Sequence, residues 1–112
     1  MPVPDLFNVP SDTVSLHRWS FAHASHHYVM VSALNAKFGA TLPVFILDPF
    51  DPENAEAWLY QHQQMHNNTE NLTGVAGFDL TDVDFHNPEE FASWIGLNAQ
   101  LHYNEATVLG VW

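Results

Sequence analysis

One spacing of rare residues occurs three times in this chain of 112 residues. Each copy has a helix-capping Asp or Asn, a Trp seven positions later, and two further polar positions at four-residue intervals. The copies are Asp12, Trp19, His23 and His27; Asp51, Trp58, His62 and His66; and Asn87, Trp94, Asn98 and His102. Because Trp and His are uncommon, identical spacing indicates an internal repeat with a period of 36 to 39 residues.

Each repeat reads as an extended arm followed by a capped helix. The first helix is predicted over Thr13 to Lys37, the second from Pro52 to near Leu72, and the third from Pro88 to Leu109. Asp12, Asp51 and Asn87 are the predicted N-caps, and a glycine (Gly39, Gly74, Gly110) follows each helix. Proline and acidic residues directly after the second and third caps suit the first helical turn.

The segments between the predicted helices are apolar and interrupted by prolines, so we expect extended arms. This predicts an all-α fold in one domain, residues 1–112. It contains an N-terminal arm (1–11) and repeats of about 12–39, 40–74 and 75–112.

Two layouts of the three-helix bundle are open. An up-down-up bundle usually has short connections, whereas these are about 13 residues long. Alternatively, each arm runs back along its helix and all three helices are parallel. About 13 extended residues reach ~45 Å, and a helix of about 24 residues is ~36 Å long. The connection lengths therefore favour the parallel layout slightly.

Charge and cysteine content exclude several kinds of function. The chain has two basic and thirteen acidic residues, with a formal net charge of −11. We therefore expect no nucleic-acid partner and no anionic membrane partner. No cysteine is present, which excludes disulfides and thiolate-bound metals. No phosphate-binding loop or nucleophile motif occurs either, so we predict a protein that is not an enzyme.

Residues four positions apart share one face of a helix, so Trp, His and His form a column in each repeat. In parallel helices like positions would form layers. The predicted layers are Trp19, Trp58 and Trp94; then His23, His62 and Asn98; then His27, His66 and His102. A ring of three imidazoles is a plausible zinc site with a fourth position for water. The alternative is a structural polar layer in which buried histidines hydrogen-bond to one another. Asn98, in place of a histidine, fits hydrogen bonding better than metal ligation.

The repeated Trp-x3-His-x3-His helices, entered through Asp51-Pro52-Glu53 and Asn87-Pro88-Glu89, carry a resemblance. Over roughly residues 12 to 109 the chain resembles small acidic proteins encoded among the virion genes of tailed bacteriophages. The resemblance implies a structural component of the particle, either a capsid decoration protein or a head–tail neck protein. Such a protein would be made in the host cytoplasm and located in the virion. It would bind larger capsid or neck proteins in several copies.

Two alternatives to the virion component stay open. The first is a metal-binding protein that uses the three-helix histidine layer. The second is an acidic protein that inhibits a host partner through its charge.

Overall fold

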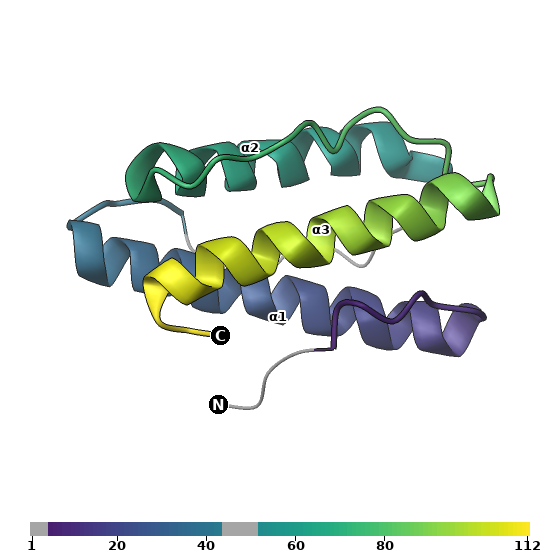
Figure 1. The fold of residues 1–112 in the computed structure, drawn as a ribbon, viewed down its shortest axis with the longest axis horizontal. Helices are drawn as coiled ribbons and strands as arrows, with labels where there is room; N and C mark the ends of the chain where they lie inside the picture. Colours follow the sequence, from purple (N-terminus) through teal and green to yellow (C-terminus); the bar gives the residue numbers. More distant parts are fainter. Residues whose placement is uncertain (1–4, 44–51) are drawn as a thin grey trace.

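The computed structural model describes residues 5–43 and 52–112. They form three α-helices and one short 3₁₀ helix, with no strand in either range. The helices are α1 (Thr13–Phe38), η1 (Pro52–Asn54), α2 (Ala55–Thr73) and α3 (Pro88–Leu109). In Figure 1 they pack side by side, and the prediction of an all-α three-helix bundle is confirmed.

The limits of α1 and α3 follow from local signals in the sequence. The Asp12 carboxylate accepts a hydrogen bond from the Ser15 amide, and the Asn87 side chain accepts from the amides of Glu89 and Glu90. These bonds satisfy amides that have no partner within the helix. At the C-terminal ends, Gly39 and Gly110 adopt φ of 64° and 74°. Only glycine enters this left-handed region without steric cost.

The start of α2 differs from the prediction. Asp51, the predicted cap, lies outside the described residues, and the α-helix begins at Ala55 with Asn54 at the N-cap position. The three residues Pro52–Asn54 form the 3₁₀ helix η1 instead of the first α-helical turn. A tight 3₁₀ turn is common at α-helix ends. It sets the α-helical start three residues later than the Asp-Pro-Glu signal indicated.

All three helices run in the same direction. In Figure 1 each helix starts at the right of the view and ends at the left, and the segment between α2 and α3 returns along the bundle. That segment has 14 residues, which span up to ~46 Å when extended. It is therefore long enough to pass back along α2, which is about 28 Å long at 1.5 Å per residue. The parallel layout is the one that the structure adopts.

The arms are anchored to the helices through the tryptophans. Leu6 in the N-terminal arm and Leu80 in the segment between α2 and α3 are both buried in the core. The indole of Trp19 donates to the Leu6 carbonyl (3.4 Å), and the indole of Trp94 donates to the Leu80 carbonyl (2.8 Å). These two segments thus each place a leucine in the core and a carbonyl against the next tryptophan. Apolar arms are required because they form part of the core.

Apolar residues enclose the interior at both ends of the bundle. The larger cluster includes Trp19, Trp58, Trp94 and Ile95, towards the helix starts. A second cluster, made of Met30, Leu34, Ala106 and Leu109, lies towards the helix ends. The column of histidines lies between these clusters along the chain. Within the described residues, no helix combines the length and hydropathy needed to cross a membrane.

The parallel layout can be tested with pairs of spin labels, because the chain has no native cysteine. Cysteines at Val14 and Glu56 mark the starts of α1 and α2, and a cysteine at Leu72 marks the end of α2; all three positions are exposed. We expect double electron–electron resonance to give a shorter distance between spin labels at positions 14 and 56 than between labels at positions 14 and 72. The opposite order would mean that α1 and α2 are antiparallel.

Candidate metal centre

The tryptophans of the three repeats meet at one level of the bundle. The ring centroids of Trp19 and Trp94 are 5.9 Å apart, and those of Trp58 and Trp94 are 5.8 Å apart. Trp19 stacks on His23 and Trp58 stacks on His62, each one turn further along its helix. The predicted tryptophan layer therefore exists, and it covers the first layer of histidines.

The predicted histidine layers follow directly. His23 and His62 have ring centroids 5.1 Å apart. In the next layer His27 lies 4.5 Å from His102 and 4.8 Å from His66, and His66 lies 4.8 Å from His102. The two layers also touch, since His23 is 4.7 Å from His102.

The five histidines form one cluster rather than two separate layers. One ring nitrogen from each lies within 4.8 Å of every other, which is the convergence that a metal ion needs. All five side chains are at most 2 % exposed. We refer to them below as the histidine cluster; its members are His23, His27, His62, His66 and His102.

Two hydrogen bonds orient His66. Its Nδ1 contacts a carboxylate oxygen of Glu105, and its Nε2 lies 3.1 Å from Nε2 of His62. Both His66 and Glu105 are completely buried. A carboxyl group on one ring nitrogen turns the other nitrogen towards the cluster, as carboxylates do behind metal-bound histidines.

His26 orients the ring of His102, as Glu105 orients the ring of His66. The Nδ1 atoms of the two rings are 2.8 Å apart, so one of them donates to the other. This contact leaves Nε2 of His102 without a hydrogen-bond partner among the described residues. On its other side His26 packs edge-on against Trp112, with centroids 5.5 Å apart. The C-terminal Trp thus closes the cluster from outside.

Several buried ring nitrogens have no partner in the described part of the chain. In the histidine cluster these are Nε2 of His23, Nε2 of His27, Nδ1 of His62 and Nε2 of His102. Both amide atoms of Asn98, in the same interior, are also unpaired within the described residues. A structural polar layer should satisfy its members, because each unsatisfied buried group costs about 1–3 kcal/mol.

Glu105 is the member of the site that the sequence pattern did not single out. It follows His102 by three positions, where the other two repeats have Met30 and Thr69. All three residues are buried. The sequence did contain a cue for this residue, because Glu105 is an acidic residue on the inward face of the predicted helix, three positions after His102. Helical-bundle metal sites pair the two residue types in the order Glu-x-x-His, whereas here the order is reversed and Glu105 contacts His66 of α2.

Burial controls the protonation of the site. Loss of solvation holds the pKa of His23, His27, His62 and His102 well below 6.5, and repulsion between neighbouring imidazoles adds to it. Burial also lowers the pKa of His66 to about 3 and that of His26 to about 4. It raises the pKa of Glu105 to about 9. At neutral pH the imidazoles are therefore uncharged, as metal ligation requires.

The other predicted residues that the structure describes lie in the interior or cap helices, and two histidines outside the repeat pattern lie on the surface. Asn98 lies in the interior with the cluster, completely buried. His17 and His86 are exposed and lie apart from the cluster. Asp12 and Asn87 cap their helices as predicted.

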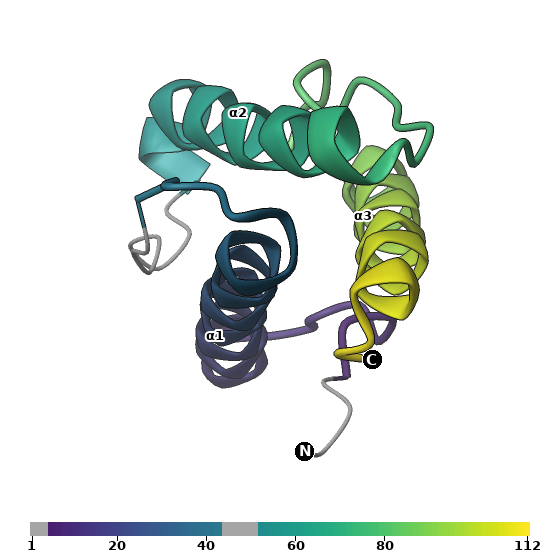
Figure 2. The same ribbon diagram turned by 90° about the vertical axis from the view of Figure 1, so that its left-hand side faces the viewer.

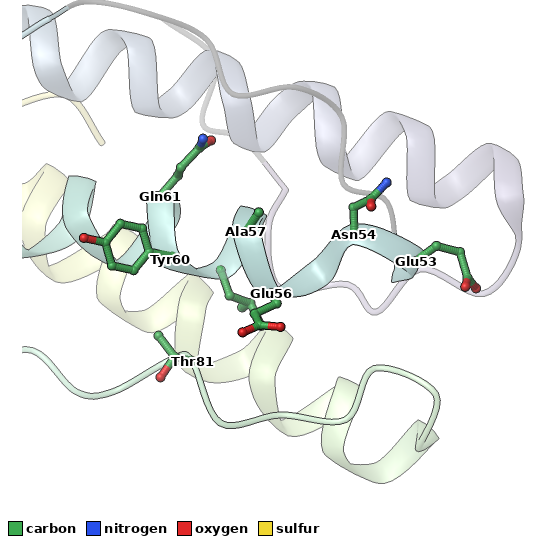
Figure 3. Close-up of a pocket in the computed structure, with 8 residues that line it drawn as sticks. Glu53, Asn54, Glu56, Ala57, Tyr60, Gln61 and Thr81 are labelled. Carbon is green, nitrogen blue, oxygen red and sulfur yellow. The ribbon is translucent and has the colours of Figure 1, made fainter.

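A surface groove of about 860 Å³ lies over the first half of α2 and the segment between α2 and α3. Figure 3 shows Glu53, Glu56, Tyr60 and Thr81 around it. Its described lining residues include no member of the histidine cluster.

In comparisons with known proteins, no family model, no curated protein and no solved structure matches the chain. These comparisons do not test the resemblance to phage virion proteins, which stays a prediction. What the site does is therefore argued from its geometry.

The lowered pKa values predict that the metal-free protein loses stability in acid. The unfolded chain binds protons at its histidines below about pH 6.5, whereas the folded chain does not. The free energy of unfolding should fall from pH 6.5 towards pH 4, by about 1.4 kcal/mol per pH unit for each proton involved. Glu105 acts in the opposite direction, since its raised pKa reduces stability as pH rises from 4.5 towards 9.

Denaturant unfolding in the presence of a chelator, at half-unit steps from pH 7 to pH 4, measures this effect. A double variant that lacks the exposed His17 and His86 is the control, and its curve should match that of the wild type. A stability that does not change between pH 7 and pH 5 would contradict the prediction.

Proposed function

We propose that this protein binds one first-row transition-metal ion in the histidine cluster. The observation that carries the proposal is the convergence of five buried imidazole nitrogens within 4.8 Å of one another. Four cluster members have a ring nitrogen without a hydrogen-bond partner in the described residues. Unpaired, uncharged and convergent nitrogens are what a metal site needs before the ion arrives.

The dimensions of the cluster suit a single ion. Donor atoms bound at about 2.1 Å from one ion are at most about 4.2 Å apart. The cluster, with separations of up to 4.8 Å, needs a contraction of less than an ångström. Imidazole ligands suit zinc, copper, iron and nickel, and no thiolate is present to favour softer ions.

Two further residues support the proposed ligands. With an ion bound, the Glu105 carboxylate accepts the Nδ1 proton of His66 and leaves the Nε2 lone pair for the metal. Its negative charge offsets part of the charge that the ion brings into the buried interior. His26 holds the ring of His102 through Nδ1 in the same way. Outer partners of this kind typically contribute 10–100-fold to metal affinity, as an order of magnitude.

The burial of the cluster favours a structural role for the ion. Its members are at most 2 % exposed, so a substrate would have to part the helices to reach them. An ion that binds only the folded chain stabilises it, by about 4 kcal/mol at a concentration 1,000 times its dissociation constant. The ion would link all three helices at once, since α1, α2 and α3 each supply at least one histidine.

Metal analysis of the protein purified without tag or chelator tests the proposal. We expect about one transition-metal ion per chain, and a melting temperature that falls when the ion is removed. The variant His66→Ala should lose the ion, while the matched variant His86→Ala, at an exposed position, should keep it. A folded wild-type protein that binds no added Zn²⁺, Co²⁺ or Ni²⁺ would refute the metal centre and favour the structural polar layer.

We also propose, as a second function compatible with the first, that the chain is a component of a phage particle. Besides the resemblance, exposed apolar side chains support it, notably Phe21 (71 % exposed), Tyr60 (66 %) and Val14 (60 %). Side chains of this kind are favourable contacts for a larger partner protein. Mass spectrometry of purified particles should detect the chain in several copies. Its presence only in the cytoplasm of infected cells would contradict this proposal.

A further inference from the structure

Asn98 is the position at which the third repeat departs from the Trp-x3-His-x3-His column of the other two. It occupies the place of His23 and His62, and its side chain is completely buried. Neither its Oδ1 nor its Nδ2 has a hydrogen-bond partner among the described residues. A buried amide with both atoms unpaired is costly, at about 1–3 kcal/mol per group.

The side chain of Asn98 faces the histidine cluster. Burial lowers the pKa of His23, His62 and His66, and a hydrogen-bonding contact from the Asn98 side chain raises the pKa of all three. The amide therefore lies close to these rings, although no atom pair among the described residues meets the distance and angle of a regular hydrogen bond. His102, one turn further along α3, belongs to the cluster itself. The amide can also rotate by half a turn without breaking a hydrogen bond, so either atom can be directed inward.

The repeat supplies two sets of three inward positions, one helical turn apart: His23, His62 and Asn98, then His27, His66 and His102. Ring contacts hold the histidines of each set together. Two stacked triangles of donors around one ion give six-fold coordination. The cluster supplies five nitrogen donors, so Asn98 is the one of these six positions that has not yet been assigned a donor atom.

We propose that Oδ1 of Asn98 is the sixth ligand and that the centre holds a six-coordinate divalent ion such as Fe²⁺, Co²⁺ or Ni²⁺. This inference rests on the proposed metal-binding function and specifies its ligand set. Zinc in proteins is almost always four-coordinate in structural sites, and a six-donor cage does not match that preference. Five imidazoles with one amide oxygen match the mixed nitrogen and oxygen ligation of the octahedral ions. Asn98 is therefore the residue that determines metal specificity.

Visible absorption of the Co²⁺-loaded full-length protein tests the coordination number. Six-coordinate Co²⁺ absorbs weakly, whereas four-coordinate Co²⁺ absorbs strongly and at longer wavelength. We expect a weak spectrum for the wild type and no change when azide is added, because no coordination position is open. An intense four-coordinate spectrum, or binding of azide by the wild type, would overturn the assignment without the use of any variant.

Two substitutions at the position then identify the ligand. Asn98→Ala should open one position, so that azide binds and changes the spectrum. Asn98→His should restore the repeat pattern, keep a weak spectrum and shift it to higher energy, since imidazole is a stronger-field ligand than an amide oxygen. The control is Asn104→Ala, on the same helix, where the side chain accepts a hydrogen bond from Gln100. Its spectrum should equal that of the wild type.

The outcomes separate this inference from the proposed function. If Co²⁺ binds to the cluster and Asn98→Ala leaves both the spectrum and the azide response unchanged, Asn98 is not a ligand and metal binding stands. If the folded wild type takes up no Co²⁺, both the metal centre and its sixth ligand are refuted.

Discussion

The parallel course of the three helices is the constraint on which the interior of this protein depends. Residues at like positions of the three repeats lie at one level only when the helices run in the same direction. The ring contacts follow this order, from the tryptophans to His23 with His62 and then to His27, His66 and His102. In an antiparallel bundle the tryptophans, which lie near the helix starts, would instead face the far end of a neighbouring helix, and the tryptophan layer could not form. The segment between α2 and α3 is therefore as necessary as the helices, because it returns the chain to the starting end (Figure 1).

The parallel layout concentrates polar rings in an interior that is closed at both ends by apolar residues. Figure 2 shows α1, α2 and α3 on three sides of this interior. Folded domains have a net stability of about 5–15 kcal/mol. Unpaired nitrogens on four cluster histidines, each at about 1–3 kcal/mol, would remove a large part of that stability. An ion bound to these nitrogens removes the penalty and adds its own binding energy. This balance favours the proposed metal centre over a purely structural polar layer.

The third repeat makes a nearly threefold scaffold asymmetric. It contributes Asn98 where the others contribute histidine, and Glu105 where they have Met30 and Thr69. Both residues are completely buried and both lie next to the cluster. The repeat thus provides the geometry of the interior, while these two departures supply an oxygen donor and a carboxyl group. Specificity in such a site depends on the residues that break the repeat.

The sequence by itself determined the three helices, most of their ends and the column of inward Trp and His positions on each helix. Spacing, caps and terminal glycines act over a few residues, so they can be read along the chain; the exception is α2, where the turn Pro52–Asn54 tightened into a 3₁₀ helix. Only the tertiary structure decided that the helices are parallel, because both layouts satisfy the same local signals. It also decided that two predicted layers merge into one cluster, and that Glu105 and His26 hold the rings of His66 and His102. Those contacts depend on how far apart the helices lie and how the rings rotate, which packing sets and spacing does not.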